Sequence, residues 1–257
     1  MSENASSIAY FCAKYPNVVI ENSINPNWYP LLNSVFEQNE ENLTQLNYFL
    51  ANILELVNPA KEHIWAFTRF CNPDEVKVVI IGQDPYPTPE LKNSMGFSVN
   101  RPNNLIPPSL QKVLDEVQRD ISNSRFAPSL RGYPPQHGCL ENWARQGVVL
   151  LDAVLTVTQN NPQSHRFRGW EKIVGSIIMY LQNIAKHNGR FIIFMLWGRV
   201  AWKMKEYVNV NGDSKVLLAG DPSSDDEMND FMGCEHFSIA NEILIRAGLQ
   251  PVDWSLE

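Results

Sequence analysis

The sequence predicts an α/β fold: a single domain with a short, central, four-stranded parallel sheet flanked by helices. Four apolar runs, at residues 76–81, 148–157, 191–196 and 215–219, are typical of strands that are buried on both faces. They alternate with stretches of helical periodicity, and this alternation implies right-handed crossovers between parallel strands. The length of 257 residues and the apolar content of 44% suit one domain with a substantial core.

Helices are expected between these strands and before the first one. Apolar residues recur at helical spacing in 109–121, where Ser109 can cap the first turn. Similar patterns occur at 171–186, 200–207 and 238–247, and two more, at 28–36 and 46–54, predict a helical cap on the core. Residues 1–25 are polar and aperiodic, so the α/β domain is expected to span residues 26–257.

Targeting and cysteine signals predict an intracellular protein. The N-terminus has no basic and apolar regions of a secretory signal, and the longest apolar run, 191–197, is too short to span a bilayer. We therefore expect a soluble protein of the nucleus or cytoplasm with no membrane partner. The four cysteines are widely spaced, which indicates neither a disulfide framework nor a zinc site.

The formal net charge of −7 bears on any role with nucleic acid. Lys and Arg supply most of the affinity for phosphate backbones, so a DNA-binding role needs a local basic face. Candidates for such a face, which a scatter of solvated charges would explain equally well, are Lys92, Arg101, Arg166, Arg168 and Arg199.

One loop places a reactive carboxylate directly after a predicted strand. The run Val78-Val79-Ile80-Ile81-Gly82-Gln83-Asp84-Pro85-Tyr86-Pro87 reads as a buried strand that leads into a stiff loop with one carboxylate. In parallel sheets ligands bind beyond the carboxyl ends of the strands, so the loops 82–97, 158–168, 197–199 and 220–230 are the expected binding region. An ordinary turn containing Asp84 is the simpler alternative for this motif taken alone.

This loop resembles the water-activating loop of the uracil-DNA glycosylases. The resemblance extends, in the family's order, from about residue 60 to residue 255. The blocks that carry it are Gly96-Phe97-Ser98-Val99, Pro107-Pro108-Ser109-Leu110, Trp143-Ala144-Arg145-Gln146-Gly147-Val148, Ala153-Val154-Leu155-Thr156-Val157, Ser164-His165, Gly169-Trp170-Glu171, Leu196-Trp197-Gly198 and Gly233-Cys234-Glu235-His236-Phe237-Ser238.

The resemblance implies an enzyme that hydrolyses the N-glycosidic bond of a flipped-out base. Asp84 matches the family carboxylate that orients water, and Gln83 matches the residue whose backbone N–H faces a uracil carbonyl. Tyr86 matches the ring that blocks a thymine methyl group, and Phe97 the ring that stacks on the base, although core packing is an equal alternative for both rings.

The same resemblance implies contacts to the DNA backbone. Ser109 and Ser223 match serines that hydrogen-bond to phosphates, a role that suits Ser109 because helix N-termini bind phosphate. Arg199 stands where the family has another such serine. Pro87 replaces the usual histidine after Tyr86, a form similar to that of some viral members.

Three acidic residues depart from the family pattern. Asp152 replaces an asparagine that reads the uracil edge; an ionised carboxylate only accepts hydrogen bonds, so the preference could move towards cytosine. Asp221, at a catalytic position, replaces a histidine that donates to the leaving base, which should lower the rate. Asp225 replaces an apolar wedge residue and should be repelled by phosphates, as should Asp226, Glu227 and Asp230.

Three functions are compatible with these departures. The first is a monofunctional DNA glycosylase with no cofactor, acting as a monomer on single- or double-stranded DNA that contains uracil. The second is a catalytically degraded relative that serves as a protein-binding scaffold in replication or repair, and the third is a nucleotide- or single-strand-binding module. If Asp84, Asp152 and Asp221 converge, their repulsion should raise a pKa or recruit Mg²⁺ or Ca²⁺, but no spacing in the sequence indicates a metal site.

Overall fold

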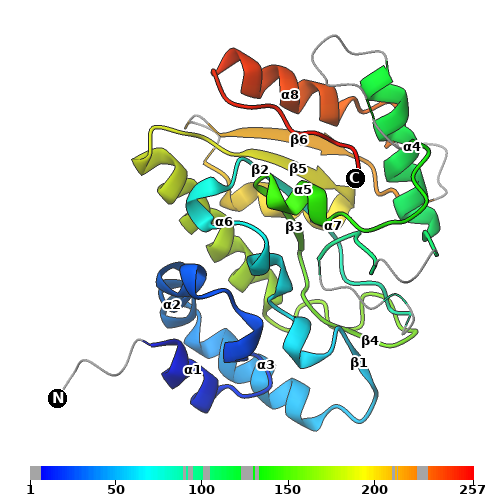
Figure 1. Ribbon diagram of the computed structural model, residues 1–257. Helices are drawn as coiled ribbons and strands as arrows, with labels where there is room; N and C mark the ends of the chain where they lie inside the picture. Colours follow the sequence, from blue (N-terminus) through cyan, green and yellow to red (C-terminus); the bar gives the residue numbers. More distant parts are fainter. Residues whose placement is uncertain are drawn as a thin grey trace.

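A parallel four-stranded sheet forms the centre of the computed structural model, which describes residues 7–88, 91, 95–100, 105–122, 130, 133–209, 212, 214–224 and 231–257. Its strand order is β3-β2-β5-β6 (Figure 1). The strands are β2 (Val78–Gly82), β3 (Val148–Asp152), β5 (Ile193–Trp197) and β6 (Lys215–Ala219). All residues of β2, β3 and β5 are buried, as their continuous apolar runs predict.

Two predicted strands differ from the structure. The run 148–157 is divided: β3 ends at Asp152, and β4 (Val157–Thr158) pairs antiparallel with β1 (Val57–Asn58) in a separate two-stranded sheet. Apolar content alone could not reveal this break, because the residues between the two strands are also buried. The fourth predicted strand, β6, lies at the sheet edge, so Leu218 is 43% exposed rather than buried on both faces.

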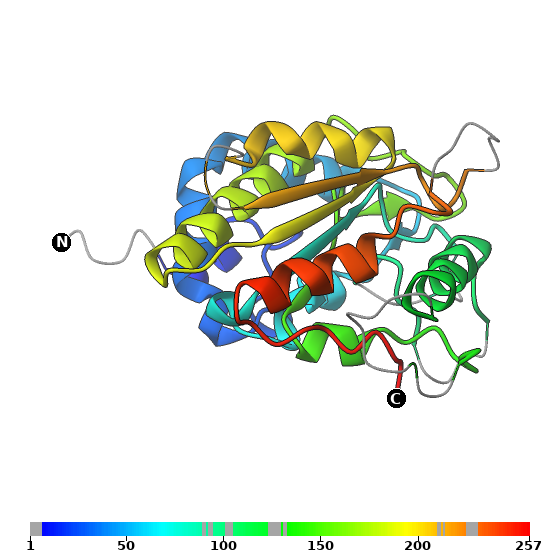
Figure 2. The same ribbon diagram turned by 90° about the horizontal axis from the view of Figure 1, so that it is seen from above.

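Helices cover both faces of the sheet. The long helix α6 (Trp170–His187) lies on one side of the strands, and α8 (His236–Arg246) lies on the other together with α4 (Pro108–Ser122) and α5 (Glu141–Arg145) (Figure 2). Among the described residues, no helix is both long and apolar enough to cross a membrane.

The predicted helix at 200–207 is two consecutive short helices, α7 (Gly198–Trp202) and the 3₁₀ helix η6 (Lys203–Tyr207). Helix α4 begins at Pro108, so Ser109 lies inside its first turn and is not the cap predicted from the sequence. Pro at a first helical position is favourable because its missing N–H has no partner to lose there.

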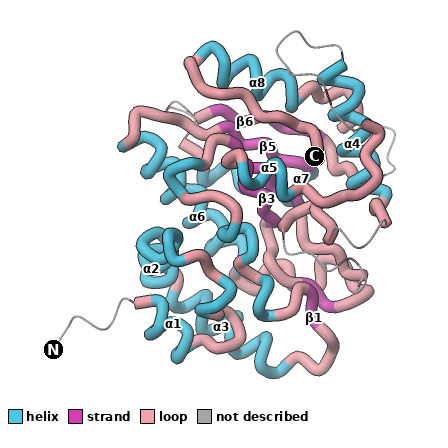
Figure 3. Tube along the Cα trace, in the orientation of Figure 1, coloured by secondary structure: helices cyan, strands magenta, loops and turns pink. Residues whose placement is uncertain are grey.

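The N-terminal helices form an outer layer against α6 (Figure 3). They are α1 (Ile8–Lys14), α2 (Tyr29–Gln38) and α3 (Glu40–Asn52), connected and followed by the 3₁₀ helices η1 (Glu21–Ser23), η2 (Pro26–Trp28), η3 (Lys61–His63), η4 (Ala66–Arg69) and η5 (Pro73–Glu75). The segment expected to be only polar and aperiodic contains α1, whose Ile8 and Phe11 belong to the core.

Two buried acids join α4 to the start of α8. Glu116, fully buried, accepts hydrogen bonds from the backbone N–H groups of Gly233 and Glu235 and pairs with Arg119. Asp120 accepts from the backbone N–H of Ser238. Negative charge near the N-terminus of a helix is favourable, so these contacts fix α8 and the segment before it relative to α4.

Candidate active site

The carboxyl ends of the four central strands meet around one cavity. The register pairs Gly82 of β2 with Asp152 of β3, and Trp197 of β5 with Ala219 of β6, so the residues that follow these positions lie at one edge of the sheet. The cavity has a volume of about 180 Å³. Its lining residues are Gln83, Asp84, Pro85, Tyr86, Pro87, Met95, Phe97, Ser109, Pro162, Asp152, Asp221 and Ser223.

Asp84 is held in one orientation by two hydrogen bonds. Its Oδ2 accepts from the backbone N–H of Gln163 at 2.6 Å, and its Oδ1 accepts from Nε2 of Gln83 at 3.0 Å. Burial raises the pKa of Asp84, and the nearby charge of Asp221 adds to this effect, while the two hydrogen bonds and Arg166 act in the opposite direction. The result is an oriented carboxylate in the wall of the cavity.

Gln163 itself was not predicted from the sequence, because its contribution is a backbone N–H that any residue other than proline would have. The residue adopts a left-handed backbone conformation, with φ of 63°. Non-glycine residues in this region are uncommon and strained, so the loop that carries Gln163 needs support from its surroundings.

That support includes the buried imidazole of His165. Its Nδ1 lies 2.8 Å from Oγ1 of Thr156, which accepts a hydrogen bond from Nε1 of Trp170, and its Nε2 lies 3.0 Å from Oγ1 of Thr158. Burial lowers the pKa of His165 to about 4, and the charge of Arg168 adds to the effect. A neutral ring therefore ties the loop of Gln163 to the segment that follows β3.

Two aromatic rings shape the cavity. Phe97, with φ of 63°, places its ring over Gly82 and 5.1 Å from the ring of Trp197. A Cβ atom on Gly82 would lie 2.8 Å from the Phe97 ring, so only glycine permits this arrangement. The hydroxyl of Tyr86 donates to the carbonyl oxygen of Phe97 at 3.2 Å and lies 3.1 Å from Oγ of Ser109. The Tyr86 ring is thus fixed at the cavity wall.

Asp152 is the buried acid of the cavity. It is 7% exposed, and its Oδ1 occupies the space in which Cβ atoms on Gly82 and Gly96 would lie, at 2.7 and 3.3 Å from it. Burial raises the pKa of Asp152 well above its usual range, with a further contribution from the charge of Asp84. These effects favour the neutral carboxylic acid, which has one donor and one acceptor face.

Asp221 also lines the cavity, on the side of β6. Its Oδ1 accepts hydrogen bonds from both the backbone N–H and the hydroxyl of Ser223, at 2.8 and 2.7 Å. Its side chain packs against Gly198, where φ is 86° and a Cβ atom would lie 2.8 Å from that of Asp221. A glycine at 198 therefore makes room for the acid.

The predicted DNA contacts are only partly placed at the cavity. Ser109 and Ser223 line it, and Ser223 is exposed. Arg199 lies outside the lining but is exposed at the first turn of α7, which begins beside Asp221. Asp225, Asp226, Glu227 and Asp230 lie outside the described residues, as do Lys92 and Arg101.

In the described part of the chain, no group of three or more His, Cys, Asp or Glu side chains is arranged to hold a metal ion.

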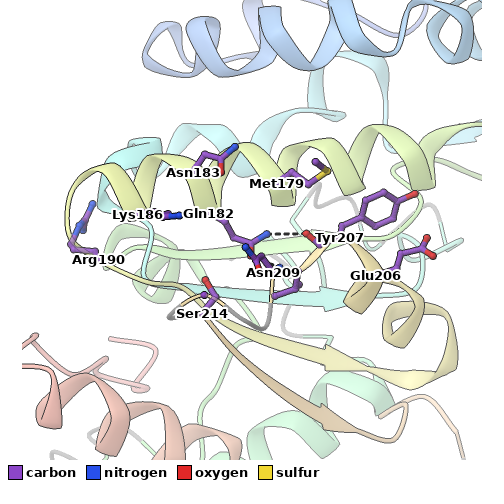
Figure 4. Close-up of a pocket in the computed structure, with 11 residues that line it drawn as sticks. Met179, Gln182, Asn183, Lys186, Arg190, Glu206, Tyr207, Asn209 and Ser214 are labelled. Carbon is purple, nitrogen blue, oxygen red and sulfur yellow. Dashed lines mark hydrogen bonds between the residues drawn. The ribbon is translucent and has the colours of Figure 1, made fainter.

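A second cavity, of about 360 Å³, is formed by the C-terminal half of α6, η6 and the segment between η6 and β6 (Figure 4). Gln182 spans part of it and donates to the carbonyl oxygen of Tyr207 at 3.0 Å. None of the residues predicted for the site lies there. The sheet edge, and not this larger cavity, therefore concentrates the candidate catalytic groups.

An oriented carboxylate and an aromatic ring around one small cavity are the parts expected of a hydrolase that acts on an extruded nucleobase. Comparison with known proteins agrees with this class. The sequence profile of the Uracil DNA glycosylase superfamily matches residues 68–244, which is more than half of the chain. The chain belongs to this superfamily, as its sequence motifs predict, and is a glycosylase of the hydrolase class.

Individual relatives cover most of the chain. The uracil-DNA glycosylase of equine herpesvirus 1 (strain Ab4p) is 38% identical over 245 residues, which are 95% of this chain and 73% of that protein. The human uracil-DNA glycosylase is 37% identical over 198 residues, 77% of this chain and 59% of the human protein.

Solved structures share the fold. The crystal structure of mimivirus uracil-DNA glycosylase superposes with a TM-score of 0.76 at 23% identity, covering 95% of this chain and 93% of that chain. A variant of the mimivirus protein in complex with UGI superposes with a TM-score of 0.75 at 24% identity, covering 95% of this chain and 94% of that chain.

The His165 network generates a prediction about stability. The unfolded state takes up a proton on this residue at about pH 6.5, whereas the folded state takes it up only near pH 4. The free energy of unfolding of the native protein should therefore fall as pH decreases through this window. Relative to neutral pH, it should lose about 3 kcal/mol more than that of His165→Gln by pH 4, as measured by urea denaturation.

The exposed His187 provides the control, because it lies outside this network at the end of α6. His187→Gln should follow the native pH profile. Parallel profiles for the native protein and His165→Gln would contradict the burial of a neutral imidazole.

Proposed function

We propose that this protein hydrolyses the N-glycosidic bond of a flipped-out pyrimidine in DNA, with uracil as the main substrate. The observation that carries the proposal is the Asp84 carboxylate, anchored by Gln163 and Gln83 in the wall of the cavity that also contains Phe97. An oriented carboxylate can position water and stabilise a cationic sugar without reorganising during the reaction.

The cavity walls suit a planar base. The Phe97 ring offers a face for stacking, and Tyr86, fixed through its hydroxyl, would limit the room beside the base, as the family resemblance implies for a thymine methyl group. A degraded scaffold would have no need of a carboxylate with both oxygens hydrogen-bonded, so this geometry favours the enzyme over the scaffold alternative.

The edge of the base would be read by Asp152 as a neutral acid. In that state one oxygen accepts from the N3–H of uracil and the hydroxyl donates to O4. Moving the proton to the other oxygen would create the complementary pattern for cytosine, which has an acceptor at N3 and an amine at C4. The family's asparagine, by contrast, would have to rotate its amide to exchange these roles. A weaker cytosine activity beside uracil excision is therefore part of the proposal.

Backbone contacts would come from Ser109, Ser223 and Arg199. Ser109 and Ser223 line the cavity, and Arg199 lies on the exposed surface of α7. We expect the chain to act as a monomer on DNA in the nucleus or cytoplasm. The proposal also includes a protein partner from replication or repair that binds its surface.

The first experiment is base release from single- and double-stranded oligonucleotides that contain one uracil, with cytosine and thymine oligonucleotides in parallel. Uracil release should occur in the native protein, with little or no thymine release, and should fall by about two orders of magnitude or more in Asp84→Asn, because the amide is neutral where a charge is needed. A folded native protein that releases no base would disprove the proposal.

Asp152 should also determine the pH profile of uracil excision. The reaction needs Asp84 ionised, so kcat/KM should rise as pH increases through its raised pKa. It also needs Asp152 neutral, so kcat/KM should fall as pH increases through the still more strongly raised pKa of Asp152. The native profile should be bell-shaped, and Asp152→Asn should lose the alkaline decline and release less cytosine relative to uracil. An alkaline decline that persists in Asp152→Asn would assign it to another group.

Asp221 should limit the rate of the native protein. An ionised carboxylate beside the cavity opposes the negative charge that develops on a leaving base. In Asp221→Asn the amide oxygen can still accept from Ser223, while its nitrogen becomes a donor to the leaving base. We expect single-turnover kcat on uracil to rise about tenfold or more. Ser223→Ala, which removes one contact to Asp221 without changing the charge, is the control and should give no such gain.

A further inference from the structure

A second surface beside the cavity combines an exposed aromatic ring with cations. Phe167 is 76% exposed, although it is a large apolar residue in an ordered loop. The guanidinium carbon of Arg166 lies 4.9 Å from the centroid of its ring, and the amine of Lys203 lies 5.8 Å from it. Arg168, also exposed, is the next residue in the chain. We refer to Arg166, Phe167, Arg168 and Lys203 as the Phe167 platform.

The backbone conformation of Phe167 holds its ring in an exposed position. Phe167 has φ of 61°, a strained conformation for an aromatic residue, and its N–H donates to Oε1 of Glu171 at 2.8 Å. Core packing does not explain the strain, because the ring lies mostly in solvent. Strained residues cluster at functional sites. Phe97, which lines the candidate active-site cavity, and Gln163, whose N–H anchors Asp84, show the same conformation.

Two segments of the chain extend from the region of the cavity to the platform. Pro162 lines the cavity, and Gln163 contacts both Asp84 and Nη1 of Arg166. Phe167 is five positions after Pro162, which places its backbone within roughly 18 Å of the cavity wall. On the other side, Arg199 and Lys203 are four residues apart along α7 and its extension, so their exposed side chains share one face.

A groove of about 420 Å³ continues beyond the ring. It is lined by Phe167 and Arg168, by one face of α3 and by Ile53, which directly follows that helix; the residues of α3 are Gln45, Tyr48, Phe49 and Asn52. Arg168 lies over the ring of Phe49 at 4.7 Å, and Tyr48 is 73% exposed. Among the residues that the structure describes, no acidic side chain lines the groove. Glu171, an acid beside the platform, accepts from the backbone N–H of Phe167.

We propose that the Phe167 platform binds the substrate strand next to the flipped nucleotide, with an unpaired base stacked on Phe167 and phosphates paired with Arg168 and Lys203. Aromatic rings bordered by cations are the usual means of holding single-stranded nucleic acid, because every base has a face to stack and every linkage a phosphate. This charge complementarity favours DNA as the occupant, in a chain whose net charge is −7. The inference rests on the proposed function for the identity of the strand.

The test measures binding separately from catalysis. Asp84→Asn protein, whose turnover should be slowed by about two orders of magnitude or more, is titrated with fluorescein-labelled single-stranded oligonucleotides that contain one uracil. The oligonucleotides extend by zero to six nucleotides on the 5′ side of the uracil or, in a second series, on its 3′ side. In one series, affinity should increase as the extension reaches the platform. The increase should be about tenfold or more. Phe167→Ala, introduced into the Asp84→Asn protein, should abolish this increase and leave the affinity for the shortest oligonucleotide unchanged.

Matched variants separate stacking from charge. Phe167→Tyr keeps a ring and should preserve the increase, whereas Phe167→Leu, which keeps apolar surface, should not. Arg168→Gln should reduce the slope of log affinity against log salt concentration by about 0.7, while Phe167→Ala should leave the slope unchanged. Lys186→Ala, an exposed cation at the other cavity (Figure 4), should change neither quantity.

Equal affinities for Phe167→Ala and its parent in both series would overturn the platform, even if the native protein excises uracil. Equal losses for Phe167→Ala and Lys186→Ala would overturn it as well, because the effect would then be general. Failure of the proposed function has a different signature, which is the absence of base release by the native protein whatever the platform variants bind.

Discussion

The parallel register of β2 with β3 and β5 is the constraint on which the site depends. It places Gly82 opposite Asp152 and brings the loops after four strands to one edge of the sheet. At that edge the small size of Gly82 and Gly198 decides what fits, since a Cβ atom on either would collide with the side chains of Phe97 and Asp152, or of Asp221. The chemistry of the cavity is therefore set by backbone geometry as much as by the reactive groups.

Three acids share this cavity because their surroundings differ. Asp84 has hydrogen bonds to both oxygens, which offset part of the effect of burial on its pKa. Asp152 is more deeply buried, so its neutral form is favoured. Asp221 is satisfied locally by Ser223. Two carboxylates close together need not both be ionised, and this difference of environment is what the roles proposed above for Asp84 and Asp152 require.

The loop from Asn160 to Arg168 couples the chemistry to the surface. Its backbone N–H at Gln163 orients Asp84, its buried His165 secures it to Thr156 and Thr158, and its tip exposes Phe167. The strain of its left-handed residues is offset by these contacts and by the hydrogen bond to Glu171. One segment thus holds the Asp84 carboxylate at one end and presents the Phe167 ring to solvent at the other.

Sequence alone was enough for the α/β class, for the strands β2 and β5 and for the family, because continuous apolar runs and a motif such as Gly82-Gln83-Asp84-Pro85 are local signals. It also placed Asp84, Tyr86, Phe97, Asp152 and Asp221 at one site through the resemblance, and all five line the cavity. It could not find the break between β3 and β4, the core role of α1, the Gln163 anchor or the exposed ring of Phe167. These features depend on which backbone groups and side chains meet across the fold, and such long-range contacts leave no periodic trace in the chain.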